Sequence, residues 1–149
     1  MKRALVLALL AGCAPGTASV GTLPLPAGKV WAQNPNLPPG GQFVFLAGAP
    51  TAAGLYTFRV KLPAGLKVMP HTHPDDRMYT VLEGQFTIGL GTEFDATKLT
   101  VLGPGDVYFL PAGTPHFHWA EAGTTVAEVT GIGPTATVYV HPEDDPRRH

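Results

Sequence analysis

The chain has 149 residues, the size of a single domain, and a formal net charge of −1, with 10 Lys and Arg against 11 Asp and Glu residues. Without a basic excess to neutralise phosphates, nucleic-acid binding is not expected. The 18 glycines and 16 prolines argue against a helical bundle, and the 44% hydrophobic content argues against a disordered chain.

The N-terminus has the pattern of a secretory signal, because Lys2 and Arg3 precede a short apolar run over residues 4–10. A membrane-spanning helix would need about 18 apolar residues. The next residues, Leu10-Ala11-Gly12-Cys13, resemble the bacterial lipoprotein processing box. This resemblance implies a lipoprotein-type signal peptide over residues 1–12 and lipidation at Cys13. Ordinary cleavage near Ala18 is the alternative, and both predict an exported protein, periplasmic or at the cell surface.

Three further regions are predicted behind the signal. Six prolines between positions 15 and 39 predict a flexible, Pro-rich tether over residues 13–39. Residues 40–142 are expected to form the folded domain, and residues 143–149 a charged C-terminal tail. On this interpretation the protein contacts the membrane only through its lipid anchor.

The folded region is predicted to consist of short β-strands. In residues 55–62, Tyr56, Phe58 and Val60 share one face and mostly polar residues occupy the other, which is the period of a half-buried strand. Turn signals rich in Gly and Pro separate most of the comparable runs, and one helical turn is expected near residues 93–98. The other predicted strands cover residues 42–46, 66–73, 78–82, 85–90, 98–102, 107–110, 115–120, 124–130 and 135–141. So many short strands at regular spacing predict a sandwich or barrel.

Four of the six histidines form two pairs, His71 with His73 and His116 with His118. Residues i and i+2 of a strand point to the same face, so each pair presents two imidazoles side by side. Imidazole is a good ligand for divalent Fe, Zn, Cu and Ni, and a weaker one for Mn. One such pair alone would more often be solvent-facing, so the surrounding residues decide the interpretation.

Glycines and prolines stand at fixed distances from both pairs. The first set is Gly65, five residues, His71-Thr72-His73, and then Gly84 eleven residues further on. The second set is Gly105, five residues, Pro111-Ala112-Gly113, two residues, and His116. In spacing and order the two sets resemble the two motifs of the cupin superfamily, as found in small single-domain bacterial cupins. The resemblance implies an all-β, double-stranded β-helix (jelly-roll) barrel that holds a divalent transition metal on His71, His73 and His116.

The first motif departs from the cupin pattern at Arg77, where that pattern has a glutamate ligand. A guanidinium remains protonated and cannot bind a metal. Three histidines could therefore hold the ion with open positions, a substitute ligand could complete the site, or the metal could be lost. His118 is the first candidate substitute and Asp76 the second. Arg77 itself could point inward and bind a carboxylate of the ligand, or turn outward and pair with Asp75 or Asp76.

Two functions of different classes remain open. One is a metal-dependent oxygenase, isomerase or decarboxylase acting on a small organic molecule, with an anionic acid among the candidates. In that case His118 is the best candidate for a general base and Arg77 for a charge anchor. The other is a non-catalytic module that binds or senses a small ligand at the cell surface. Cupins often pair through their sheets, so the resemblance also implies a homodimer.

Overall fold

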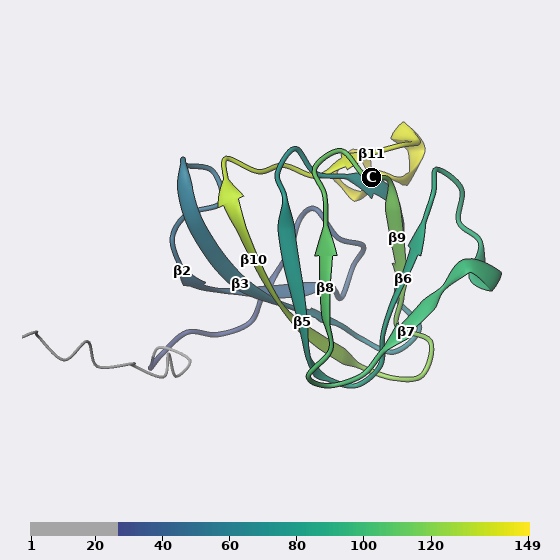
Figure 1. The fold of residues 1–149 in the computed structure, drawn as a ribbon, viewed down its shortest axis with the longest axis horizontal. Helices are drawn as coiled ribbons and strands as arrows, with labels where there is room; N and C mark the ends of the chain where they lie inside the picture. Colours follow the sequence, from purple (N-terminus) through teal and green to yellow (C-terminus); the bar gives the residue numbers. More distant parts are fainter. Residues whose placement is uncertain (1–26) are drawn as a thin grey trace, which may run out of the picture.

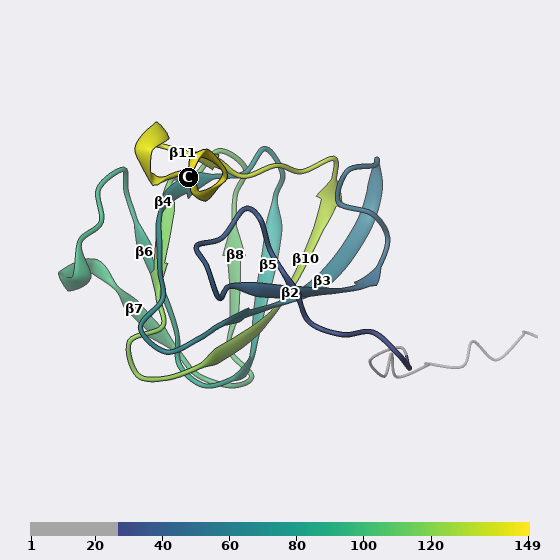
Figure 2. The same ribbon diagram turned by 180° about the vertical axis from the view of Figure 1, so that it is seen from behind.

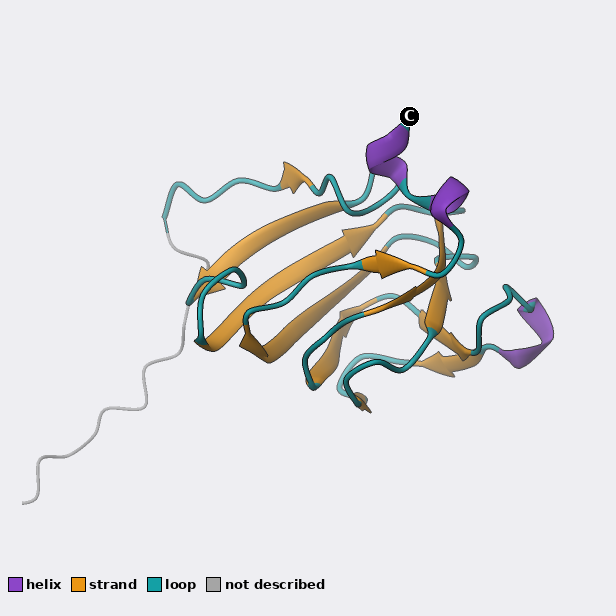
Figure 3. Ribbon diagram, turned by 90° about the horizontal axis from the view of Figure 1, so that it is seen from above, coloured by secondary structure: helices purple, strands orange, loops and turns teal. Residues whose placement is uncertain are grey.

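The computed structural model describes residues 27–149, so the signal, Cys13 and the first half of the predicted tether lie outside the described residues. The fold consists of two antiparallel sheets that face each other (Figure 1, Figure 3). The first sheet has the order β1 (Ala32–Gln33), β2 (Gln42–Ala47), β3 (Gly54–Leu62), β10 (Thr125–Gly133), β5 (Arg77–Glu83) and β8 (Val107–Leu110). The second has the order β11 (Val138–Tyr139), β4 (Lys67–Thr72), β9 (His116–Trp119), β6 (Phe86–Leu90) and β7 (Thr100–Leu102). The predicted all-β, jelly-roll barrel is thereby confirmed.

The alternation of side chains along each strand builds the interior of the barrel. In β5, Arg77, Tyr79 and Val81 are buried while Met78 between them is exposed. In β3, Tyr56, Val60 and Leu62 are buried, and these residues pack with their counterparts from the opposite sheet. The space between the sheets is therefore apolar over most of its depth and becomes strongly polar where the histidines, Asp75 and Arg77 enter it.

Most strands fall where the sequence predicts them, and a short helix follows at Ala96–Lys98, within the expected turn. The main differences lie at the end of the chain. β10 continues to Gly133, and β11 contains two residues instead of the predicted run over 135–141. Residues 134–137 instead form a loop beside the barrel mouth, and this loop supplies several contacts of the site described below.

The second half of the predicted tether is docked onto the barrel. β1 pairs with β2, and the backbone N–H of Asn34 donates to the carbonyl of Gly41 at 2.9 Å. Residues 34–37, here called the strap, cross the open side of the barrel (Figure 2). Leu37 packs against the core, and the hydroxyl of Tyr139 donates to the carbonyl of Asn36 at 2.8 Å. The prolines of this segment thus shape a turn and do not act as a spacer here.

The charged tail also folds back onto the domain. Two short helices, Pro142–Asp144 and Pro146–Arg148, follow β11. Arg147 donates from Nη1 to Oδ1 of Asn36 at 3.2 Å and from Nη2 to the carbonyl of Thr137 at 3.0 Å, so the tail helps to hold the strap. Within residues 27–149, no helix has the length and apolar character needed to cross a membrane.

Candidate metal centre

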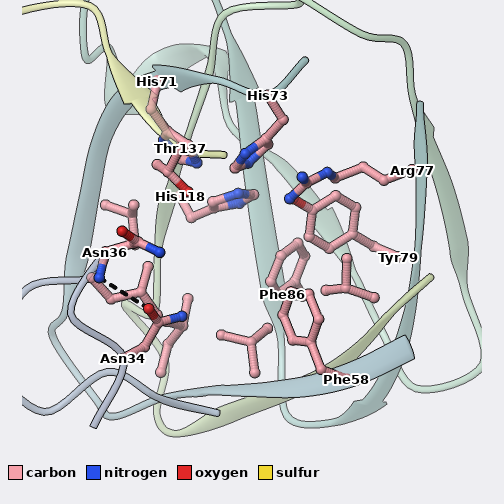
Figure 4. A pocket seen from close by; sticks show the side chains of 15 residues that line it. Asn34, Asn36, Phe58, His71, His73, Arg77, Tyr79, Phe86, His118 and Thr137 are labelled. Carbon is pink, nitrogen blue, oxygen red and sulfur yellow. Dashed lines mark hydrogen bonds between the residues drawn. The ribbon is translucent and has the colours of Figure 1, made fainter. Parts of the chain in front are cut away.

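Three predicted ligands meet inside the barrel. His71 lies in β4, His73 follows directly after it, and His116 begins β9, which pairs with β4 so that His71 and His116 are register partners. One side-chain nitrogen from each histidine lies within 4.8 Å of the others, and all three residues are buried. The two histidines of the first pair point into the cavity from the same strand segment (Figure 4). The arrangement is positioned to hold one metal ion.

Backbone carbonyls fix the orientation of the three rings. Nδ1 of His71 lies 2.7 Å from the carbonyl oxygen of Met69. Nδ1 of His73 lies 2.8 Å from the carbonyl oxygen of Ala136. Nδ1 of His116 lies 3.0 Å from the carbonyl oxygen of Thr114. A carbonyl oxygen only accepts hydrogen bonds, so each Nδ1 carries the proton and each Nε2 presents a lone pair. This is how backbone groups commonly orient histidine ligands.

The donor set fits a metal ion, because Nε2 of His116 is buried and has no hydrogen-bond partner among residues 27–149. A buried acceptor without a partner costs about 1–3 kcal/mol, and a cation between the three nitrogens would satisfy it. Burial lowers the pKa of His71 to about 3, with the neighbouring His118 and Arg77 charges acting in the same direction. Burial likewise holds the pKa values of His73 and His116 far below the ordinary value. All three are therefore neutral near pH 7, the form that binds metals.

His118 lies outside this group, although it shares a face with His116. Its ring centroid lies 5.1 Å from that of His116 and 4.8 Å from that of Phe86, so it packs against the apolar part of the interior. Its Nδ1 lies 3.0 Å from the carbonyl oxygen of Thr87, and burial lowers its pKa to about 4. The prediction that His118 serves as a substitute ligand is therefore not supported, but the residue still borders the cavity.

Asp76, the second candidate substitute, is exposed, and its Oδ1 accepts a hydrogen bond from the backbone N–H of Ala112 at 2.7 Å. Side chains alternate along the chain at this point, and Asp76 follows the buried Asp75. Its carboxylate therefore stabilises a loop at the surface of the barrel, and the prediction of Asp76 as a ligand is not supported either.

Arg77 points into the barrel and is only 5% exposed, which rules out the outward orientation. Its Nη2 donates to Oδ1 of Asp75 at 2.8 Å and to Oγ1 of Thr135 at 2.5 Å. The hydroxyl of Tyr56 donates to the other carboxylate oxygen of Asp75, also at 2.5 Å. The predicted pairing with Asp75 is thus confirmed, but it occurs inside the barrel.

Sequence reasoning missed Tyr56 and Thr135, the two neutral members of this network. They lie 19 and 60 positions from Asp75 along the chain. The alternation in residues 55–62 did place Tyr56 on the inward face. Nothing in the sequence marks Thr135, because its approach depends on the path of the loop after β10.

A small cavity lies beside the histidines, with a volume of about 60 Å³. Its polar lining includes His71, His73, His118, Arg77 and Tyr79, which point toward a shared space (Figure 4). Apolar residues such as Phe58 and Phe86 form the floor, and the strap closes one side. The cavity is large enough for a water molecule or a small functional group and not for a whole metabolite.

We expect Gly131→Ala to destabilise the protein by about 1–3 kcal/mol, because the Cβ atom would overpack the network that holds Arg77. This Cβ would lie 2.5 Å from the Tyr56 hydroxyl and 2.7 Å from Oδ2 of Asp75. Urea unfolding measures the effect. Ile132→Thr in the same strand, at a residue that is 59% exposed, is the control and should change stability by less than about 0.5 kcal/mol. Equal stability of the two variants would contradict the packing argument.

Comparison with known proteins shows which family the chain belongs to. A family model described as "Cupin domain" matches residues 58–133, which include the three histidines and Arg77. The chain belongs to the cupin family. Over 75 residues it is 41% identical to germin-like protein subfamily 1 member 4 of Arabidopsis thaliana, a match that covers 48% of this chain and 33% of the relative. The chain thus spans about a third of the length of this curated relative.

Solved structures agree with the fold. The DMSP lyase DddQ from Ruegeria pomeroyi DSS-3 is 27% identical, with a TM-score of 0.62 over 77% of this chain and 62% of that protein. The polyketide cyclase RemF from Streptomyces resistomycificus is 21% identical, with a TM-score of 0.65 over 81% of this cupin and 86% of that chain. At this identity, RemF supports the barrel alone. The variety among these names indicates that the cupin barrel does not by itself define a reaction.

Proposed function

We propose that this cupin holds one divalent transition metal on His71, His73 and His116 and binds a small organic molecule beside it. The observation that carries the proposal is the convergence of three buried nitrogens, with Nε2 of His116 lacking any other partner in the part of the chain that the structure describes. When bound, such an ion supplies Lewis acidity for an oxygen of the ligand. The ligands suit Fe, Zn, Ni or Cu, and Mn less well.

The chain's own residues limit the chemistry. His118 holds its proton at Nδ1 toward Thr87 and can accept one at Nε2, yet its pKa near 4 makes it a weak base. Burial raises the pKa of Tyr79, so this hydroxyl stays protonated and can donate a hydrogen bond. An enzyme built on this site would bind, orient and polarise its substrate, and would not rely on a strong side-chain base.

A non-catalytic binding or sensing protein is the second candidate. The observation that favours it is the lining of the small cavity, where no Asp or Glu is found among the described residues. No side chain there has a pKa suited to proton transfer near pH 7. For either function, the N-terminal pattern supports export to the periplasm or cell surface with a lipid anchor at Cys13, and a homodimer remains a prediction.

Elemental analysis of the purified protein tests the metal proposal, and we expect about one transition-metal ion per chain. His116→Ala should lose the ion, because two histidines alone bind weakly. His141→Ala, at a side chain that is 38% exposed and outside the three-histidine group, should retain it. Circular dichroism checks that both variants are folded.

The proposal fails if the chain remains metal-free after reconstitution with each of the five candidate metals. Oxygen uptake and product analysis on a panel of small organic molecules then separate the two functions. Turnover supports the enzyme. A metal-loaded protein that turns over nothing but melts at a higher temperature with a panel member supports the binding protein.

A further inference from the structure

A second, larger pocket opens beside the small cavity, with a volume of about 480 Å³. Small-molecule sites typically have about 300–1,000 Å³, so this outer pocket has the size that the inner cavity lacks. The two share part of their lining, namely Arg77, Phe58, Thr137 and two asparagines of the strap region. A ligand that reaches the histidines would therefore keep its body in the outer pocket and extend one functional group inward.

Aromatic rings line one wall of the outer pocket. Phe43 and Phe45 from β2 lie beside Phe58 from β3, with ring centroids 4.7 Å apart for the first two and 5.9 Å apart for Phe45 and Phe58. Pro50 and Ala136 also line this pocket. All three rings are half-buried, so a ligand can remove further apolar surface from water by covering them. A flat, apolar body of aromatic size fits such a wall.

The charges in the outer pocket are balanced. Among the described residues, Arg77 is the only charged one in its lining, and the ion pair with Asp75 neutralises it at 2.8 Å. Both side chains are almost completely buried, at 5% and 3% exposure. An anionic group placed here would lose its hydration without gaining an unpaired cation, which is unfavourable. This balance argues against the anchor for a carboxylate that Arg77 was expected to provide.

Arg77 still has hydrogen-bond donors to offer. A guanidinium carries five N–H groups, and within residues 27–149 only Nη2 of Arg77 donates to a partner. Nη1 has no partner among these residues and, unlike the fully buried Nε, is not closed off from the pocket. A neutral oxygen, such as that of a ketone, amide, alcohol or phenol, can accept from this side chain without carrying charge into the site.

We propose that the outer pocket binds an uncharged molecule with an aromatic-sized apolar body and a carbonyl or hydroxyl oxygen that accepts a hydrogen bond from Arg77. This deepens the proposed function by naming the class of ligand, and it depends on that function only for the role of the metal. The aromatic body covers Phe43, Phe45 and Phe58, and the oxygen lies where the two pockets meet, on the side of the histidines.

Three soluble probes test the proposal by titration into the ¹⁵N-labelled 149-residue chain, followed by NMR. Benzamide has the neutral oxygen and the ring, benzoate carries a charge, and acetamide lacks the ring. We expect benzamide to bind at least tenfold more tightly than benzoate and acetamide, and to shift the Arg77 Nε–H resonance. Phe45→Ala should weaken benzamide binding about tenfold, since the ring loses its contact.

Phe109→Ala is the matched control, because Phe109 is 56% exposed on β8 and lines neither pocket. It should leave benzamide affinity unchanged, and Phe43→Ala replaces Phe45→Ala if the latter does not fold. The proposal is overturned if benzoate binds as tightly as benzamide, or if the ring variants bind benzamide like the unmodified chain. Titrations in chelator separate the two proposals. Benzamide binding by a chain that never takes up metal would support the ligand class and reject only the metal function.

Discussion

Asp75→Asn is expected to lower the free energy of unfolding by about 3–5 kcal/mol, because it leaves the Arg77 guanidinium buried without a counter-charge. The two side chains are 3% and 5% exposed, and 2.8 Å separates Oδ1 of Asp75 from Nη2 of Arg77. Asparagine preserves the shape of the side chain, but its single amide oxygen can accept from Tyr56 or from Arg77 and not from both sides. The loss therefore reports on the charge together with one lost acceptor.

A double-mutant cycle isolates this charge interaction. Arg77→Met should also destabilise the protein by several kcal/mol, since it strands the carboxylate in the same apolar surroundings. The double variant should be more stable than the sum of the two single effects implies, with a coupling of about 2 kcal/mol or more. Urea unfolding of all four proteins supplies the numbers.

The ion pair between Arg59 and Glu128 is the matched control. Its atoms lie 3.1 Å apart, much like the inner pair, but its side chains are 26% and 31% exposed. Glu128→Gln should cost less than about 1 kcal/mol, as is usual for accessible pairs. If Asp75→Asn is as mild as Glu128→Gln, Arg77 is better hydrated than its burial indicates, and the argument for an uncharged ligand is weakened with it.

The histidine site was predictable because both of its segments carry motifs that resemble those of cupins, although His116 lies 45 positions from His71. Period-two spacing places His71 and His73 on one face, and glycines at fixed distances set where the strands begin. The same rule did not settle the position of His118, whose ring packs against Phe86 and whose Nδ1 faces the carbonyl of Thr87. A shared face does not guarantee a shared ligand position.

The strap and the orientation of Arg77 could not be predicted, because both depend on contacts that are distant in sequence. Asn36 is held by Tyr139 and Arg147, which lie 103 and 111 positions further along the chain. The same stretch is rich in proline, and this composition predicts a tether when the sequence does not reveal the distant residues that hold the segment. Likewise, the hydroxyl of Thr135 that receives a hydrogen bond from Arg77 lies 58 positions away.

Metal-free protein is expected to lose most of its stability as the pH falls from about 6.5 to about 4. The cause is the set of buried histidines. Burial lowers the pKa of His71 to about 3 and that of His118 to about 4, whereas a histidine in the unfolded chain titrates near 6.5. Between these values the unfolded chain binds protons that the folded chain excludes, so acid favours unfolding.

The expected loss of stability follows from the number of buried histidines. Each excluded proton costs about 1.4 kcal/mol per pH unit below 6.5, so His71 and His118 together remove about 4 kcal/mol by pH 5. His73 and His116 act in the same direction, because burial lowers their pKa values as well. The total is comparable with the 5–15 kcal/mol that typically stabilises a domain.

Other groups do not reverse this trend. Hydrogen bonds from Thr135, Tyr56 and Arg77 outweigh burial and lower the pKa of Asp75, so its contribution is lost only at still lower pH. Glu93 raises the pKa of His141, which stabilises the folded chain in acid, but that side chain is 38% exposed and its effect is small.

Urea unfolding in chelator at pH values between 8 and 5 measures the slope of the free energy of unfolding against pH. His118→Gln should reduce it by about 1.4 kcal/mol per pH unit, because one proton fewer is bound on unfolding. His141→Gln, the exposed control, should leave the slope nearly unchanged. Added metal should delay the loss, since protons and the ion compete for the same Nε2 atoms. A free energy of unfolding that is flat across this range would mean that the histidines are hydrated, and the closed, neutral site described above would have to be abandoned.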